Sequence, residues 1–272
     1  MKLSFTIVAL FLTTISLFAQ EKPDVEPKGN KGKIYFYWGW NRGSFSNSNI
    51  SFSGSDYNFT LKDVVADDRQ TSFDAQTYLL PGNATIPQYN FRIGYFITDN
   101  YNISFGIDHM KYVMRQEQTV VIDGEINNSG TIYDGAYSND EIKLTDDFLQ
   151  FEHTDGLNYA NISFRRFDEI YELYKIKISL TEGIGVGILY PKTNTSLLNK
   201  ERYDEFHLAG YGLDAVVGVN LSFLKYFFIQ SEIKGGYINM PNIRTTNSES
   251  DKASQDFFFS QIMIVFGASI SL

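Results

Sequence analysis

The chain lacks cysteine altogether, and its 272 residues include only three histidines, six prolines and two tryptophans. The missing cysteine excludes a disulfide framework, thiolate chemistry and lipid attachment through a cysteine. After residue 19 no apolar run approaches the roughly 18 residues of a membrane-spanning helix. A basic face is also missing, because the formal net charge is −9, and nucleic acid is therefore not expected as a partner.

The N-terminus carries the pattern of an export signal. Lys2 is followed by an uncharged apolar run from Leu3 to Ala19, which predicts a cleaved signal peptide over residues 1–19. An N-terminal membrane anchor is the alternative, but the run is short for a spanning helix. A polar leader follows over residues 20–32, and residues 33–272 form the expected domain.

What the chain has in abundance is alternation of apolar and polar residues, with aromatics making up 16% of the sequence. The last twelve residues, QIMIVFGASISL, place Ile262, Ile264 and Phe266 on one parity and polar or small residues on the other. A period of two is the signal of a β-strand. The expected strands cover residues 33–45, 88–98, 101–108, 148–167, 175–188, 210–222, 227–237 and 261–272.

The connections between these segments alternate in length. Short links are expected at Asp99-Asn100, Asp168 to Tyr174 and Leu224-Lys225, whereas residues 46–86, 117–147, 191–206 and 241–254 form long polar loops. Short turns on one side and long loops on the other are typical of outer-membrane barrels. The sequence therefore predicts an all-β fold: a closed antiparallel up-and-down transmembrane β-barrel of eight strands, with short periplasmic turns and long extracellular loops.

The fourth expected strand changes parity partway. Leu149 and Phe151 are odd, whereas Ile162 and Phe164 are even. We expect a bulge near Asp155-Gly156 that keeps both apolar sets on one face.

A soluble barrel would show the same period with its apolar faces turned inward. Strand length and a face rich in Gly, Ser and Asn favour lipid outside, because a narrow lumen is polar. Aromatic residues near the strand ends are expected to form interface girdles. These are Trp38, Trp40, Tyr89, Tyr101, Tyr190, Tyr211, Tyr226 and Tyr237.

Charged residues on the inward parity are expected to pair and to plug the lumen, because eight strands enclose only enough room for their own side chains. The predicted charge network consists of Arg92, Asp108, Arg165, Lys177, Asp214, Glu232 and Lys234. Glu182 breaks the pattern, since its parity points to lipid. It is expected either to turn inward at a local bulge or to pair with a neighbour such as Tyr159.

With these strands, the whole mature chain resembles the small eight-stranded outer-membrane β-barrel proteins. The LFAQ ending of the signal resembles secretory signals of Bacteroidota. The resemblance implies export to the outer membrane, contact with outer-membrane lipid and lipopolysaccharide, insertion by the barrel insertion machinery, and a monomer. In that family the last strand commonly ends on Phe, whereas this chain ends on Leu272.

One short stretch suggests chemistry. The segment FEHTDGLNYANISFRR is similar to the His-x-Ser-Asn segment of outer-membrane lipid A deacylases, and His153 matches their histidine. Asp155 stands where those enzymes have the serine nucleophile, and Thr154 is a candidate substitute hydroxyl. A catalytic triad needs a nucleophile, a base and an orienting acid within hydrogen-bond reach. A bulge or strand-top turn is the simpler reading.

The sequence thus favours a non-enzymatic barrel with no cofactor and no metal site, acting in surface interaction or envelope integrity. Loop contacts are expected in Tyr57 to Asp68 and in Asp134 to Asp147. A lipid A-type hydrolase that uses His153 and a small-solute channel are the two alternatives.

Overall fold

The computed structural model describes residues 29–83 and 85–271. The predicted signal peptide, residues 1–19, and most of the predicted leader, residues 20–32, lie outside the described residues. None of the helices in the described ranges is long and apolar enough to cross a membrane. The barrel described below comprises residues from Lys31 onward.

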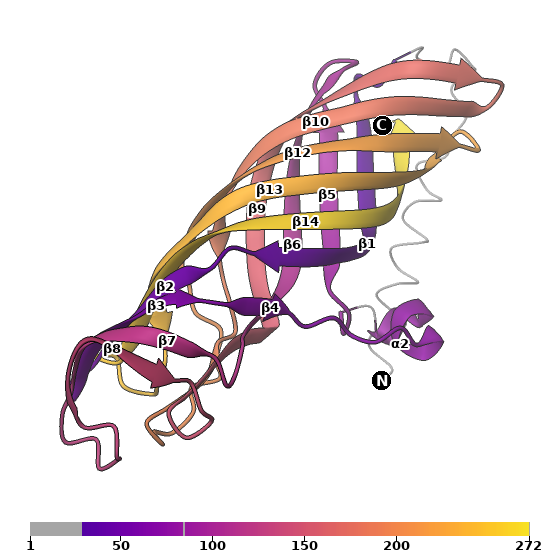
Figure 1. Ribbon diagram of the computed structural model, residues 1–272. Coiled ribbons are helices and arrows are strands. Elements are labelled where there is room, and N and C mark those ends of the chain that lie inside the picture. Colours follow the sequence, from indigo (N-terminus) through magenta and orange to yellow (C-terminus); the bar gives the residue numbers. More distant parts are fainter. Residues whose placement is uncertain (1–28, 84, 272) are drawn as a thin grey trace. The chain divides into compact units, whose positions relative to one another are not determined.

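Eight antiparallel strands form a closed ring (Figure 1). Their bounds, in ring order, are Lys33–Phe45 (β1), Tyr89–Phe96 (β5), Tyr101–Met114 (β6), Leu149–Leu173 (β9), Ile176–Leu189 (β10), Gly210–Phe223 (β12), Phe227–Arg244 (β13) and Lys252–Ser271 (β14). The ring closes where β14 pairs with β1, from Ser271 opposite Lys33 to Phe259 opposite Phe45. The predicted eight-stranded antiparallel barrel is confirmed.

Short turns join the strands at one end of the ring, as predicted. Residues 97–100, 174–175 and 224–226 make these turns, and Leu224 and Lys225 adopt φ angles of 50° and 72°. One boundary is wrong: the expected link from Asp168 to Tyr174 is mostly strand, because β9 continues to Leu173 and pairs with β10 throughout. The β9–β10 hairpin therefore reaches beyond Tyr101, where β6 begins.

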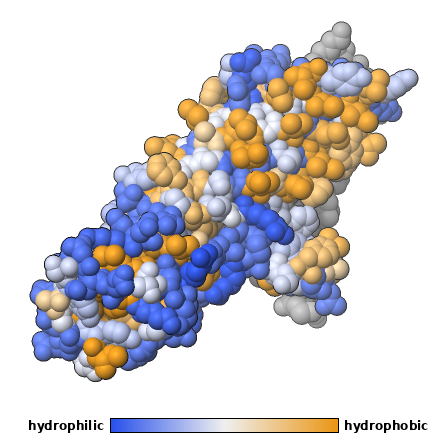
Figure 2. All heavy atoms as spheres, in the orientation of Figure 1, coloured by the Kyte–Doolittle hydropathy of each residue, from blue (hydrophilic) through white to orange (hydrophobic). Residues whose placement is uncertain are grey.

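The part of the ring nearer the short turns directs its apolar side chains outward. Each of the eight strands contributes at least one exposed large apolar residue: Phe36, Ile93, Ile103, Phe164, Ile184, Val217, Ile233 and Ile262. Figure 2 shows hydrophobic residues, in orange, gathered over the visible part of the barrel wall, whereas the far end of the same unit is mostly hydrophilic. A closed barrel satisfies all its backbone groups internally. With this exterior it is a transmembrane barrel of the outer-membrane type.

Three of the four long connections contain strands of their own, which corrects the sequence-based expectation of irregular loops, and the fourth is shortened because β13 runs to Arg244 and β14 begins at Lys252. The three contain Ser48–Ser53 (β2), Tyr57–Val64 (β3), Ala66–Asp68 (β4), Thr119–Ile126 (β7), Gly135–Lys143 (β8) and Asn194–Leu197 (β11), together with the short helices Ala75–Leu79 (α2) and Pro81–Asn83 (η1). Strands β2, β3, β7 and β8 extend the sheet from β14 and lie beyond the ring (Figure 1). We call these strands, with β4, β11 and the distal ends of β6, β9, β13 and β14, the extracellular lobe.

The extracellular lobe has an apolar interior. Phe52, Phe59, Phe151, Ile238 and Phe257 are among its fully buried core residues. Phe151, Ile238 and Phe257 lie on ring strands and share the inward parity that carries buried polar residues nearer the short turns of the same strands. The wall therefore inverts its polarity along its length: in lipid the apolar face is outside, and in water the apolar face is inside.

This inversion explains the parity change in β9. A bulge lies where it was predicted: Met110 pairs with Leu157 and Tyr112 with His153, so β9 advances four residues while β6 advances two. The reason given for it was wrong. Two extra residues preserve parity, so Phe151 points into the core of the lobe while Ile162 points outward to lipid.

Candidate functional site

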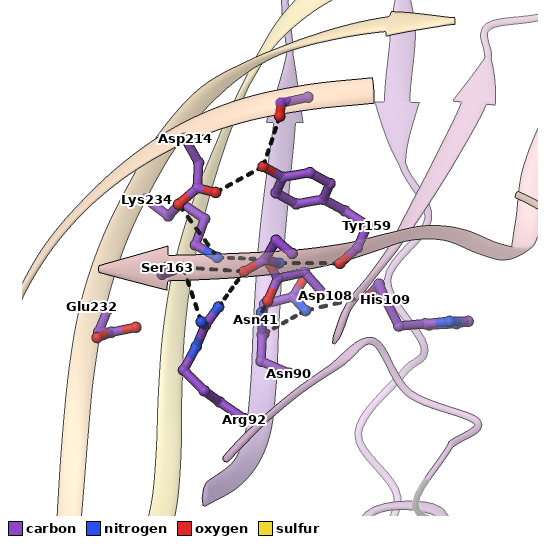
Figure 3. A network of polar contacts seen from close by, with 12 residues as sticks. Asn41, Asn90, Arg92, Asp108, His109, Tyr159, Ser163, Asp214, Glu232 and Lys234 are labelled. Carbon is purple, nitrogen blue, oxygen red and sulfur yellow. Dashed lines mark hydrogen bonds and ion pairs between the residues drawn. The ribbon is translucent and has the colours of Figure 1, made fainter. Parts of the chain in front are cut away.

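The inside of the ring holds a polar layer built from alternate residues of the wall strands (Figure 3). Arg92 on β5 is fully buried and makes its hydrogen bonds to neutral partners. Its guanidinium donates to Tyr37 Oη at 3.0 Å, Ser104 Oγ at 3.0 Å, Ser163 Oγ at 2.9 Å and Asn161 Oδ1 at 2.6 Å. Arg92 thus connects its own strand, β5, to β1, β6 and β9.

A second cation spans the lumen. Arg165 on β9 donates from Nη1 to Glu232 Oε1 at 2.5 Å and from Nη2 to Oε2 at 3.2 Å. Both side chains are at most 1% exposed. Gln230 also donates to Glu232, at 2.6 Å, and the Tyr37 hydroxyl donates to it at 3.3 Å.

The third cation lies nearer the extracellular lobe. Lys234 Nζ lies 2.5 Å from Asp108 Oδ2 and 3.9 Å from Asp214 Oδ1. Asn90 donates to the other oxygen of Asp108 at 2.5 Å. The Tyr159 hydroxyl lies 2.9 Å from Asp214 Oδ2 and donates to it. Figure 3 shows these side chains, from opposite walls, pointing toward one another.

The charges in this layer balance. Three cations, Arg92, Arg165 and Lys234, face three carboxylates, Asp108, Asp214 and Glu232. Buried charges are tolerated when they are paired and hydrogen-bonded. These ion pairs hold opposite walls of the barrel together.

Apolar layers cover the polar layer on both sides. Toward the short turns, Tyr35, Phe96, Phe167 and Phe228 form a buried cluster, with Tyr35 and Phe96 ring centroids 5.6 Å apart. Toward the outside, the core of the extracellular lobe begins at Tyr159. The lumen is therefore filled by side chains in three successive layers.

Lys177 does not belong to the charge network predicted for it. Its side chain is 44% exposed near the β9–β10 turn, where it pairs with Glu169 at 2.9 Å and Glu172 at 3.5 Å. The alternation predicted correctly that Lys177 lies on the inward side of β10. The residue lies on the protruding β9–β10 hairpin, however, and therefore outside the closed lumen. The other six predicted residues all lie inside the ring.

The predicted interface aromatics lie at several levels of the barrel wall. Tyr101 and Tyr226 lie at the short-turn end, and Tyr190, Tyr211 and Tyr237 lie where the strands enter the extracellular lobe. Trp40 and Tyr89 pair in register on β1 and β5. Trp38 is different, because it pairs with Phe91 and Phe266 inside the apolar exterior rather than at its edge.

His153 lies in the lobe core, fully buried, and does not meet the residues proposed to act with it. Its Nδ1 shares a hydrogen bond with the Thr193 hydroxyl at 3.0 Å, while Nε2 has no partner among the described residues. Thr154 bonds Glu152 and Asp155 pairs with Lys192 at 3.1 Å. Burial lowers the pKa of His153 to about 3, so the ring is neutral, and its hydrogen-bond partner is the Thr193 hydroxyl rather than Thr154.

Acidic residues near the tip of the lobe do not converge. In the described part of the chain, no three His, Cys, Asp or Glu side chains are placed to hold a metal ion. Asp134 instead accepts hydrogen bonds from the hydroxyl and the backbone N–H of Ser129, and these hold the pKa of its carboxyl below the usual value.

Sequence reasoning missed the neutral members of the lumen layer. Tyr37, Asn161 and Ser163 carry most of the hydrogen bonds of Arg92, and Tyr159 completes the environment of Asp214. Their inward parity was visible in the sequence, but the search was limited to charged residues.

The chain is similar to known proteins in its fold alone. No family model and no curated protein sequence matches the chain. Among solved structures it is similar to the outer membrane protein OprG from Pseudomonas aeruginosa, with 9% identity and a TM-score of 0.46 over 90% of this chain and 98% of that one. It is also similar to the outer membrane protein AlkL in DMPC lipid bilayers, with 12% identity and a TM-score of 0.42 over 94% and 98%. A third is Ail, the attachment invasion locus protein of Yersinia pestis, with 9% identity and a TM-score of 0.35 over 88% and 99%. At these values the fold is established by the strand pairing of this chain itself.

Proposed function

We propose that the protein is a non-conducting outer-membrane barrel whose extracellular lobe makes its contacts at the cell surface. The observation that carries this proposal is the continuous packing from the lumen into the lobe. Phe59 and Phe151 are fully buried inside the lobe, so its strands form a fixed surface rather than mobile loops. A barrel that served only as a membrane anchor would not need this second core.

The surface offered by the lobe is acidic at its outer sheet edge. Strand β8 pairs only with β7 and exposes Asp140 and Glu141. Its pairing shifts register at Ile122, and Asn139 adopts a φ of 58°. Charges and a bulge on an edge strand discourage pairing with another sheet. The edge is therefore suited to contacts through charged side chains with a cationic partner.

Conductance tests the closed lumen. The purified protein in planar lipid bilayers is expected to give no stable open steps, because paired charges and aromatic side chains fill the ring. Reproducible single-channel steps from the folded, heat-modifiable protein would establish the channel alternative and overturn this part of the proposal.

Binding of polylysine-coated beads to whole cells tests the role of the lobe. Cells producing the Asp140→Lys, Glu141→Lys double variant are expected to bind fewer beads than wild type. Glu201 and Glu205 are also exposed, in the connection between β11 and β12, so Glu201→Lys with Glu205→Lys is the control of equal charge change. Equal loss in both variants would reduce the effect to net charge and contradict a role for β8.

No geometry favours the hydrolase alternative around His153. Thr154 and Asp155 make their contacts elsewhere, and the imidazole lies inside an apolar core with Tyr112 and Phe151 against it. The stretch that resembles a lipid A deacylase segment is a bulge where β9 leaves the membrane.

A further inference from the structure

The outer wall of the barrel carries one group of charges that neither the lumen nor the lobe uses. Arg166 on β9 and Glu182 on β10 are register partners, and both are exposed on the face that otherwise meets lipid. Asp168 joins them through an ion pair in which Arg166 Nε lies 2.7 Å from Oδ2. The group holds one cation and two carboxylates, so one negative charge is left uncompensated.

Arg166, within this group, lies near the periplasmic edge of the apolar exterior. Arg166 also pairs in register with Tyr101, the first residue of β6, and its guanidinium lies 5.8 Å from the centre of the Tyr101 ring. Phe164 lies one outward position further into the membrane. Arg166 and Asp168 therefore lie where lipid headgroups reach the barrel wall, whereas Glu182 lies further in, with exposed Leu180 between it and the short turn.

A surface pocket of about 180 Å³ lies beside the charges. Its lining residues are Asp168, Leu180, Thr181, Glu182, Val217 and Gly218. Leu180 and Val217 are exposed and apolar, whereas the two carboxylates supply acceptors. A single pocket therefore combines an apolar wall with acceptors, which matches the junction between the headgroup and the apolar part of a lipid.

We propose that this pocket binds the headgroup of a phospholipid that carries a primary ammonium, such as phosphatidylethanolamine. The ammonium donates hydrogen bonds to Glu182 and compensates the excess charge. Asp168 engages the Nε and Nη2 atoms of Arg166, and a guanidinium has further donors at Nη1 for the lipid phosphate. A trimethylammonium headgroup has no N–H to donate, so the site distinguishes ethanolamine from choline.

The pocket also accounts for Glu182 itself. An acid on the lipid face of a barrel carries a free-energy cost, and the expected ways to avoid it were an inward turn at a local bulge or pairing with a neighbour such as Tyr159. Glu182 stays outward with Arg166 as its register neighbour, and Tyr159 donates to Asp214 inside the lumen instead. A cationic headgroup removes the cost without moving the side chain.

Native mass spectrometry of the full-length protein released from detergent micelles tests the proposal. The micelles contain equal amounts of phosphatidylethanolamine and phosphatidylcholine with identical acyl chains. Wild type is expected to retain about tenfold more ethanolamine lipid, as the loss of one charge-assisted hydrogen bond implies. Glu182→Gln should bring the ratio to about one, while Glu205→Gln, at an exposed acid of the lobe, should leave it unchanged. A wild-type ratio near one, or a ratio that Glu182→Gln leaves unchanged, would overturn the proposal.

Two further measurements test whether the lipid occupies this pocket and whether the bound headgroup belongs to a lipid. Val217→Phe fills the pocket and should reduce retention of both lipids, whereas Ile233→Phe should not. Val217 and Ile233 are register partners and are both 58% exposed, so this control is closely matched. Free phosphoethanolamine at the same concentration should leave no adduct, because it lacks the apolar part that Leu180 and Val217 contact. An adduct as abundant as that of the lipid would show a soluble ligand and overturn the lipid assignment.

Discussion

Arg165 on β9 and Glu232 on β13 form a buried bidentate ion pair across the lumen, between strands that are not neighbours in the ring. The pair holds two walls of the barrel together at the level of the polar layer. It also makes each partner dependent on the other, because a buried charge without its counter-charge is costly.

Replacing Arg165 by Met is therefore expected to lower the free energy of unfolding by about 3–5 kcal/mol, since Glu232 is left unpaired in the lumen. The Arg165→Met, Glu232→Gln double variant should recover a large part of this loss. Urea unfolding in lipid vesicles measures both. Arg202→Met removes an exposed Arg of the lobe that pairs with Asp204 and serves as the control. Equal, small effects of the two Arg variants would contradict the role of the lumen pair.

The core of the extracellular lobe should be separable from the barrel by mutation. Phe151→Ala removes a fully buried ring and is expected to cost about 3–5 kcal/mol locally. Limited proteolysis of folded protein should then cut within β3 or β7 while the membrane part remains heat-modifiable. Ile132 is 88% exposed, so Ile132→Ala should keep the wild-type pattern. An uncleaved lobe in the Phe151 variant would contradict a packed core.

Acid should weaken the lobe through His153. Burial depresses its pKa to about 3, whereas a histidine in the unfolded chain titrates near 6.5. Its contribution to stability is thus complete above pH 6.5 and is lost as pH falls toward 3, at about 1.4 kcal/mol per pH unit. Hydrogen exchange of the lobe amides at pH 7, 5 and 4 measures this. His153→Asn removes the titration and should flatten the profile relative to wild type; identical profiles would refute the assignment.

The turn between β12 and β13 stores strain that can be relieved. Leu224 adopts a φ of 50° and is 66% exposed, so its side chain gains little from packing there. The left-handed region is unfavourable for a branched residue and better tolerated by Asn. Leu224→Asn is expected to stabilise the barrel by about 1 kcal/mol in urea unfolding. Leu221→Asn on the lipid face of β12 should destabilise it instead, and the same sign for both would be inconsistent with turn strain.

The sequence predicted the eight membrane strands because period two is strong where one face meets lipid. It placed six lumen charges, such as Arg92 and Lys234, for the same reason. The prediction for Lys177 was wrong because alternation shows on which side of the wall a residue lies but not where along the strand the hairpin leaves the ring.

The extracellular strands were missed although their alternation was present. Ile50 and Phe52 in β2, and Tyr57, Phe59 and Leu61 in β3, follow period two and are all buried. Polar residues between them, and their short length, were interpreted as loop. Periodicity alone also could not show that the wall inverts, because the same alternation fits an apolar face turned either way; the surrounding solvent decides.

The central claim is that β9 carries its outward side chains from water into lipid without a change of parity. Since the chain has no cysteine, single nitroxide labels can be placed at Gln150 and Ile162, which share that parity and are both exposed. Power-saturation electron paramagnetic resonance in lipid vesicles measures their access to oxygen and to a water-soluble nickel complex. The label at residue 162 should respond to oxygen and the label at residue 150 to nickel. Strong nickel access at residue 162 would contradict the account.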